Sequence, residues 1–470
     1  MASFKTGSEY IIALRKLTQS KSLIKSASQK PVLNEIIGSS IPFIPSLSAP
    51  ELRSFAKSLL LIQSSQKLNL NSLVFKSINK RLLELVTDGE DSHCVISTLN
   101  SLSQIRRETH DGGPPALRPD TVWKFSGKFL QTASVLDKCE FLTIMSRLNL
   151  KPMDEMMMRI DGLNENAIFL SHSDIEDLKT NPDRGIANGR ISACILAMLK
   201  LDCFSFRRFS TFTSLLRLVP PRIEEFSPME LANTAYAIAA SVVLESEDEA
   251  GLLPIEESDF RIRLIIQILR NLYRKRSNVS VAAMNQIGVV HYSLKNGASD
   301  IYADEMSRVH PLRKFLDECL LMVSKDTVNE LKESKAQQVV RKALDKIGLF
   351  DIMKDEVAVG PFRLDFAIPE LRLGIEIDGP YHYYYKSNAA TAKTRFKRIV
   401  VENQEQFRLI TVSYLELKEE GDKVNFFDEQ IRNLLNISRK VVSLRSEVKR
   451  LIKDGSTPTG RSNSAKVRPR

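Results

Sequence analysis

Apolar and small residues recur every three or four positions over most of the first 325 residues. Leu52, Phe55 and Leu59, for example, fall on one side of a helix. The same spacing begins again at Val95, Cys194, Leu231 and Met284. Because this is the period of an amphipathic α-helix, we expect residues 35–325 to be helical almost throughout.

Two of the expected helix starts are near copies of each other. Ser48-Ala49-Pro50-Glu51-Leu52 and Ser227-Pro228-Met229-Glu230-Leu231 each place a serine before a proline and a glutamate, which favours the first turn of a helix. Long second helices are expected at Asn71 to Val86 and Phe260 to Arg276. Such recurrence predicts degenerate α-helical repeats stacked as a solenoid. The alternative is an irregular α-helical domain that binds protein partners.

The pattern changes after residue 330, where short alternating segments appear between helices. The expected elements are a helix from Ser334 to Ile347, a strand from Glu356 to Val359, strands from Phe362 to Ile368 and Leu371 to Asp378, a basic helix from Ser387 to Glu405, a strand from Phe407 to Leu415 and a helix over 424–438. This order predicts an α/β sandwich that contains an antiparallel hairpin. The chain is therefore expected to be multidomain, with a solenoid-like body followed by an α/β domain over 330–440.

The two middle strands are expected to gather three carboxylates on one face. Successive residues of a strand face opposite ways. The polar faces therefore hold Asp365 on the first strand and Glu376 and Asp378 on the second. The apolar faces hold Phe362, Leu364, Phe366, Ile368, Leu371, Leu373, Ile375 and Ile377.

The register of this hairpin follows from the turn that joins the strands. A two-residue connection at Pro369-Glu370 places Asp365 opposite Gly374 and Arg363 opposite Glu376. The two polar faces then coincide. A three-residue turn would shift the register and break this coincidence.

Three linked motifs in this region resemble a known family. They are Asp365-Phe-x-Ile-Pro369, Glu376-x-Asp378-Gly-Pro-x-His382 and Thr394-x-x-Lys397-Arg398. Together they resemble a RAP domain, an RNA-associated module related to Vsr-like and other PD-(D/E)xK nucleases. The chain departs from that family at Gln406 and Leu417, where packing positions usually hold a glycine and an aromatic residue. The resemblance implies a PD-(D/E)xK-like fold and contact with RNA.

One hypothesis for the carboxylates is a metal-dependent endonuclease. Asp365 and Glu376 would then hold Mg²⁺ or Mn²⁺, with Asp378 and His382 as further catalytic groups. Asp378, however, occupies the place where the nuclease motif has a lysine, and Lys386 is the candidate to replace it. The sequence therefore favours a nuclease-derived fold used for binding, without a cofactor, over a working enzyme.

Tyrosines and basic residues beside the carboxylates are the candidate RNA contacts. Exposed rings can stack on unpaired bases, and cations can hold phosphates. The candidates are Tyr381, Tyr383, Tyr384, Lys386, Lys393, Arg395, Lys397 and Arg398, together with Arg270, Arg274 and Lys275 of the helical region. The alternatives are that some of the rings pack under the following helix and that the charges form an ordinary solvated face.

Charge is concentrated at the ends of the chain, although the net charge is +10. Residues 439–470 hold ten basic and two acidic residues, and residues 441–470 are expected to be a basic, partly disordered tail. Residues 1–34 hold six basic residues, one acid and many serines, which resembles a mitochondrial presequence. The alternative is an ordinary basic first helix. The apolar run from Thr234 to Leu244 is about half as long as a helix must be to cross a bilayer.

The sequence therefore predicts an organellar RNA-binding protein of the mitochondrial matrix. By resemblance, its expected roles are RNA processing, RNA stabilisation or assembly of ribosomal RNA into ribosomes. The expected partners are mitochondrial transcripts or ribosomal RNA, together with ribosomal or other RNA-processing proteins, and no membrane. A structural component of the mitochondrial ribosome is a further alternative.

Overall fold

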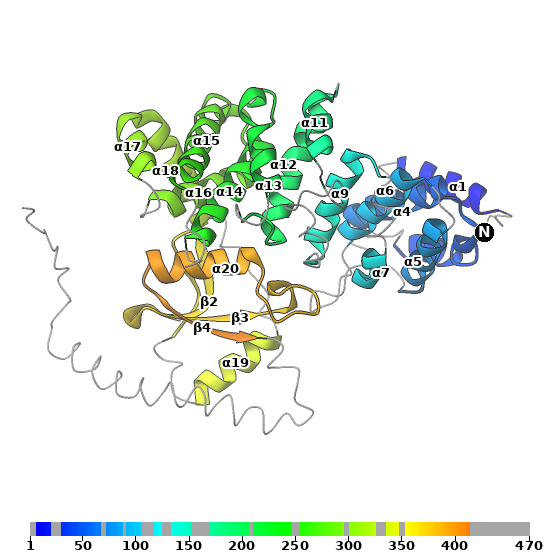
Figure 1. Ribbon diagram of the computed structural model, residues 1–470. Helices are drawn as coiled ribbons and strands as arrows, with labels where there is room; N and C mark the ends of the chain where they lie inside the picture. Colours follow the sequence, from blue (N-terminus) through cyan, green and yellow to red (C-terminus); the bar gives the residue numbers. More distant parts are fainter. Residues whose placement is uncertain are drawn as a thin grey trace, which may run out of the picture.

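A helical body followed by a small α/β unit makes up the computed structural model (Figure 1). The structure describes residues 6–19, 30–66, 72–87, 91–105, 117–124, 133–151, 170, 172–181, 183–205, 210–246, 254–295, 300–325, 335–346 and 353–413. The predicted fold class is confirmed. The predicted closing helix at 424–438 and the basic tail at 441–470 lie outside the described residues.

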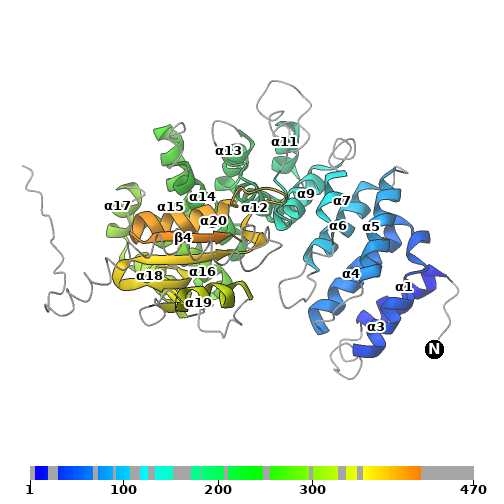
Figure 2. The same ribbon diagram turned by 90° about the horizontal axis from the view of Figure 1, so that it is seen from below.

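The body is an array of helices in two layers (Figure 2). In the first layer each helix contacts the next, in the order α1 (Gly7–Gln19), α4 (Ala49–Gln66), α6 (Ser92–Gln104), α9 (Val135–Arg147), α12 (Arg184–Lys200), α14 (Pro228–Glu245), α16 (Val281–Lys295) and α18 (His310–Lys325). The second layer contains α5 (Ser72–Thr87), α7 (Pro119–Lys124), α11 (His172–Thr180), α13 (Ser210–Arg217), α15 (Ile255–Arg274) and α17 (Asp300–Arg308). This arrangement agrees with the predicted helical array.

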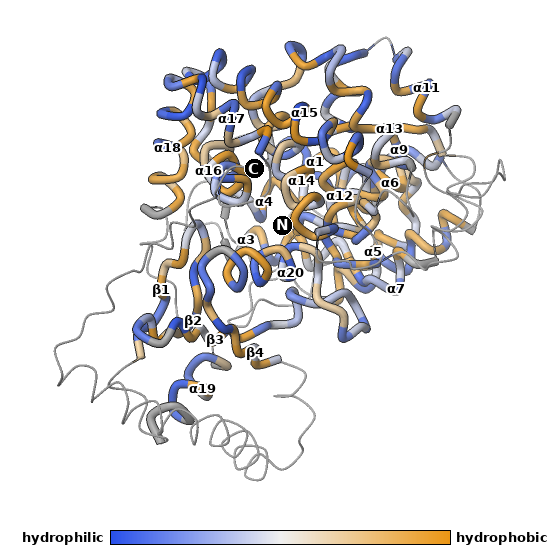
Figure 3. Tube along the Cα trace, turned by 60° about the vertical axis from the view of Figure 1, so that its left-hand side comes forward, coloured by the Kyte–Doolittle hydropathy of each residue, from blue (hydrophilic) through white to orange (hydrophobic). Residues whose placement is uncertain are grey.

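Helix starts in the body are fixed by side-chain caps. Ser227 accepts a hydrogen bond from Glu230 N, and the Glu230 carboxylate accepts one from Ser227 N, at 3.4 and 2.7 Å. This reciprocal capping box satisfies amide groups that a helix leaves unpaired at its start. The interior side chains form one continuous hydrophobic cluster along the array, and hydrophobic and hydrophilic segments alternate along the helices (Figure 3).

The amino-terminal helix is packed into this array. Tyr10 and Leu14 of α1 are buried, and the Tyr10 ring meets Phe55 of α4 edge to face at 6.3 Å. The Tyr10 hydroxyl donates to the carbonyl of Ile36 in α3 (Lys30–Ser39). The predicted boundary of the presequence at residue 34 thus falls inside α3.

Gly288 on α16 marks a close approach to α18. A Cβ atom at this position would lie 2.7 Å from Val323 Cγ2 and 2.8 Å from the carbonyl oxygen of Cys319. Gly288→Ala should therefore lower the free energy of unfolding by about 1–3 kcal/mol, measured by urea denaturation. In α3, Gly38→Ala has no atom within 4 Å to meet and should stabilise by up to about 1 kcal/mol. Stabilisation by both changes would contradict the tight contact.

The α/β unit is a mixed four-stranded sheet between helices. Its elements are α19 (Lys335–Lys346), β1 (Lys354–Val359), β2 (Phe362–Ile368), β3 (Leu373–Asp378), α20 (Ala392–Ile399), a π-helical turn (Val400–Gln404) and β4 (Arg408–Ser413). The strand order is β1-β2-β3-β4, with β4 parallel to β3 and the other neighbours antiparallel. α19 covers one face of the sheet and α20 the other (Figure 1). The predicted sandwich with an internal hairpin is confirmed.

The register of the hairpin differs from the prediction. Phe366 pairs with Ile375 and Ala367 with Gly374, so Asp365 is not opposite Gly374. The connection runs from Pro369 to Arg372, where a 3₁₀ turn is followed by a residue with φ of 47°. It is two residues longer than predicted, and an even shift keeps the same sides of the strands together.

The predicted alternation along β2 is wrong at one point. Leu364 packs with Ala367 and Val401 beneath α20, whereas Phe366 packs with Val340 on the α19 face. The switch occurs at Asp365, where β2 separates from β3. Pairing between these strands is confined to residues 366–368 of β2.

Candidate functional site

Asp365 ends the pairing of β2 with β3. Its Oδ2 accepts a hydrogen bond from Ile377 N at 2.7 Å, and its Oδ1 accepts one from Gln337 Nε2 of α19 at 2.8 Å. The side chain thus satisfies a strand amide that would otherwise bond to the neighbouring main chain. Asp365 is a structural link between the two strands and α19.

Glu376 forms a buried ion pair with a lysine from α20. Both of its carboxylate oxygens accept hydrogen bonds from Lys397 Nζ at 2.7 Å, and only 5% of Glu376 is exposed. Lys397 also donates to the carbonyl of Arg363 at 2.6 Å. Burial raises the pKa of Glu376 to about 7, although the Lys397 charge opposes this rise. The positive group beside the carboxylate therefore comes from the helix that covers the sheet.

This geometry corrects the hypothesis that Lys386 replaces the missing lysine. Lys386 instead pairs with Asp120 of the body at 2.9 Å. A sequence signal for Lys397 exists, because it belongs to the Thr394-x-x-Lys397-Arg398 motif. Thr394 is buried on α20, and residues three apart on a helix lie on the same side, so this spacing points Lys397 at the strands.

Asp378 is held by three donors at the end of β3. Its carboxylate lies 2.7 Å from His382 Nδ1, accepts a hydrogen bond from the Tyr383 hydroxyl at 3.2 Å and pairs with Arg398. Burial on its own would raise the pKa of Asp378, but His382 and Arg398 hold it below its ordinary value. Asp378 thus ties the turn after β3 to α20.

The carboxylates do not fit a divalent cation in this arrangement. Each oxygen of Asp365 and Glu376 already accepts a hydrogen bond from an amide or an ammonium group. Among the residues described, no group of three or more His, Cys, Asp or Glu side chains is arranged to hold a metal ion. A metal ligand must present its lone pairs to the ion, and here those lone pairs face protein donors.

The tyrosine run docks the α/β unit onto the body. Tyr384 is 2% exposed; its hydroxyl donates to the Lys200 carbonyl at 2.9 Å and accepts from Ala392 N at 3.1 Å. Tyr383 is 7% exposed, and Tyr381 is 54% exposed. The expectation that Tyr383 and Tyr384 stack on bases is therefore corrected, because their rings pack inside the protein. Tyr381 retains an accessible ring.

Two equivalent helix ends of the body receive this tyrosine run, Tyr381 to Tyr385, which we call the docking loop. Asn149 after α9 and Asp202 after α12 both have positive φ, at 51° and 65°. Asn149 Nδ2 donates to the Tyr381 carbonyl at 2.9 Å, and Asp202 pairs with Arg395 of α20. The left-handed residue that ends each helix thus presents its side chain to the α/β unit.

Most of the predicted RNA-binding cations have acidic or carbonyl partners inside the protein. Those of the α/β unit are Lys386 with Asp120, Arg395 with Asp202, Lys397 with Glu376 and Arg398 with Asp378. Lys393 is exposed, and no partner of its ammonium group is found in the described part of the chain. The basic helix also starts later than predicted, at Ala392, because Thr391 caps it.

The predicted cations of α15 are also engaged. Arg270 pairs with Glu305, Arg274 lies 3.1 Å from Glu224, and Lys275 Nζ donates to the Glu224 carbonyl at 2.7 Å. The Arg274 side chain is 70% exposed, and an exposed ion pair contributes only about 0–1 kcal/mol. A phosphate could therefore replace such a carboxylate at little cost.

No helix in the described residues is long and apolar enough to cross a membrane.

Comparison with known proteins gives one specific result. No curated protein matches the chain. Residues 375–427 match the family model of the RAP domain, from β3 through α20 and β4 into residues beyond those described. The sequence resemblance is thereby confirmed: the chain carries a RAP domain, a module that generally binds RNA, at the end of a helical body.

Proposed function

We propose that this protein binds RNA in mitochondria and acts in RNA processing, RNA stabilisation or ribosome assembly. The observation that carries this proposal is the RAP domain match at residues 375–427. The helical body enlarges the surface available to RNA, because the RAP domain is docked on α12 and α14. Ribosomal or RNA-processing proteins are the further partners that we propose.

Binding without cleavage is the form of this function that the site geometry favours. A nuclease of this fold would need Asp365 and Glu376 free to hold a cation. In this protein Lys397 occupies both oxygens of Glu376, and a strand amide occupies Asp365. Opening the site to a metal would leave Lys397 and Ile377 N without their buried acceptors, which is unfavourable.

Location in the mitochondrial matrix is supported by the composition of residues 1–34, with six basic residues and one acid. Part of this segment also packs on the body. Tyr10 and Leu14 are buried, so removal of residues 1–34 would uncover Phe55 and its neighbours on α4. We therefore propose that α1 stays with the imported protein.

Crosslinking of the full chain to RNA in cells, followed by sequencing, tests the proposal. We expect mitochondrial transcripts, with ribosomal RNA among them, to be enriched over cytosolic RNA. The purified protein should bind single-stranded RNA and leave it intact in Mg²⁺ or Mn²⁺. Cleavage that is abolished by Asp365→Ala would overturn the binding-only function, and enrichment of cytosolic RNA alone would overturn the location.

A further inference from the structure

Three cations from both parts of the protein meet where the RAP domain docks on the body. Arg147 and Lys200 are the last residues of α9 and α12. Each is followed by a leucine and then by a residue with positive φ, Asn149 or Asp202. Because α9 and α12 are neighbours in one layer, these equivalent positions bring the two cations to the same end of the array.

The third cation, Lys393, is placed beside them by the docking loop. The Tyr384 hydroxyl joins the Lys200 carbonyl to the amide of Ala392, which precedes Lys393 in the chain. One turn further along α20, Arg395 pairs with Asp202, two residues after Lys200. The start of α20 is thus fixed at the end of α12. We call Arg147, Lys200 and Lys393 the junction cluster.

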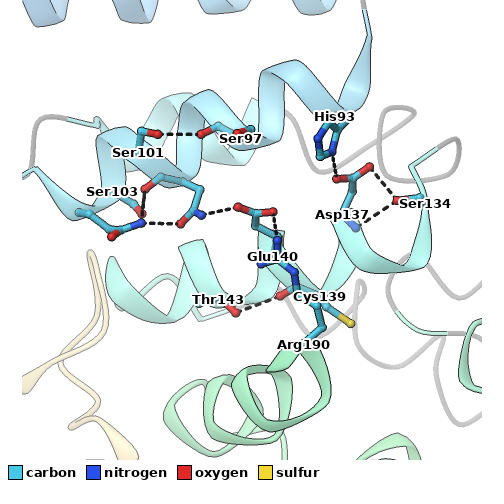
Figure 4. Close-up of polar contacts among 12 residues, drawn as sticks. His93, Ser97, Ser101, Ser103, Ser134, Asp137, Cys139, Glu140, Thr143 and Arg190 are labelled. Carbon is cyan, nitrogen blue, oxygen red and sulfur yellow. Dashed lines mark hydrogen bonds and ion pairs between the residues drawn. The ribbon is translucent and has the colours of Figure 1, made fainter. Parts of the chain in front are cut away.

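The acids near the junction cluster are shared with other cations. Asp202 is shared by Arg395 and Lys151, and Glu140, whose charge also acts on Arg147, lies 2.6 Å from Arg190, a pair visible in Figure 4. The guanidinium of Arg147 donates to neutral partners, Asn100 Oδ1 and, at 3.2 Å, Ser103 Oγ. Within the described ranges, no carboxylate pairs with Lys200 or Lys393.

Like charges held close together weaken the folded state, and within the described residues Lys200 and Lys393 have no carboxylate of their own. Burial lowers the pKa of Lys200, and the charges of Lys393 and Arg147 lower it further. Folding alone offers no reason to keep Lys200 and Lys393 side by side, whereas an anionic ligand would remove the repulsion. Arg147 and Lys393 are exposed and Lys200 is half-buried, so a ligand can reach all three.

We propose that the junction cluster binds the sugar-phosphate backbone of single-stranded RNA, in a site that the body and the RAP domain form together. This inference rests on the proposed RNA-binding function and names the residues that perform it. Tyr381 favours RNA over another polyanion, because this aromatic residue is 54% exposed and its carbonyl is anchored to Asn149, two residues after Arg147. A group of cations near an exposed aromatic residue matches phosphates followed by a base.

The test uses the full chain with Lys200→Gln and Lys393→Gln combined. We expect its dissociation constant for a labelled single-stranded RNA to rise at least tenfold. The slope of log affinity against log salt should fall by about 1.4, because each phosphate contact to a single strand contributes about 0.7. Tyr381→Ala should weaken binding with an unchanged slope, since stacking releases no counterions.

The matched control replaces two exposed lysines elsewhere, Lys314 on α18 and Lys342 on α19, by glutamine. This control removes the same charge and should bind RNA nearly as the wild type does. The junction variant should keep or raise the Tm, because it removes a repulsion. A lower Tm would instead trace the lost affinity to misfolding and contradict the site.

Three further outcomes would overturn the proposal. If the wild type binds RNA and the junction variant binds equally well, the site is wrong while the proposed function stands. If the wild type binds no RNA, both fall. If the wild type prefers poly-glutamate to RNA and the junction variant loses that binding, the ligand is an acidic protein segment.

Discussion

Replacing Lys397 by methionine should lower the free energy of unfolding by about 3–5 kcal/mol at pH 8. The substitution keeps much of the apolar stem but leaves Glu376 charged and buried without a cation. It also removes the hydrogen bond that Lys397 donates to the Arg363 carbonyl. Urea denaturation followed by circular dichroism measures the loss.

The stability lost in Lys397→Met should depend on pH, and the pKa of Glu376 sets the direction of this dependence. Burial raises its pKa to about 7 in the folded protein, above the ordinary value of 4.5. The folded state therefore binds the proton more tightly, and this contribution to stability is present below pH 4.5 and lost as the pH rises to 7. Without Lys397 the pKa of Glu376 rises further. Lys397→Met should consequently cost much less at pH 5 than at pH 8.

Two further variants separate the buried pair from a general charge effect. Combining Lys397→Met with Glu376→Gln removes both charges and should recover part of the stability, with little dependence on pH between 5 and 8. Lys386→Met removes an exposed lysine whose side chain is 68% accessible, and it should change stability far less than Lys397→Met does. Equal losses for Lys397→Met and Lys386→Met would show that the Glu376 ion pair does not stabilise the domain.

The elements of the α/β unit were predictable because each follows from a local pattern. Alternation identified β2 and β3, and helical spacing identified α19 to within one residue at each end. The register was not predictable, since it depends on the turn from Pro369 to Arg372. Nothing local in Pro-Glu distinguishes a two-residue turn from a four-residue turn.

The site was predicted less well than the fold because its partners are distant in sequence. Glu376 was identified as a site residue, but its cation comes twenty-one positions later in the chain, from the helix that covers the Glu376 face of the sheet. Nothing in the local sequence distinguishes Tyr384 from the exposed Tyr381. Its partner is the main chain of Lys200, 184 residues earlier, and only the fold reveals such a contact.

Through these distant contacts the docking loop and α20 hold the α/β unit on the body, a role that the family resemblance does not predict. Phe396 of α20 belongs to the hydrophobic cluster of the body, not to that of the sheet. Its ring meets Tyr236 of α14 edge to face at 5.7 Å and Phe362 of β2 at 6.0 Å. One side chain therefore joins three elements from the two parts of the protein. The orientation of the junction cluster depends on this contact.

Phe396→Ala should lower the free energy of unfolding by about 3–5 kcal/mol, and both the body and the α/β unit should be destabilised near the cavity. Hydrogen exchange measured by mass spectrometry reports the location of the loss. We expect faster exchange in α20 and also in α14, because the cavity lies between them. RNA affinity should fall as well, since Lys393 would no longer be held beside Lys200.

The matched control for this change is Phe366→Ala on the opposite face of the sheet. Phe366 is as deeply buried as Phe396, but it packs with Val340 and Ile375 inside the α/β unit. Its truncation should cost a similar free energy, and the faster exchange should stay within residues 335–413. If Phe396→Ala also left exchange in α14 unchanged, the two parts would not share a core, and the combined RNA site would lose its physical basis.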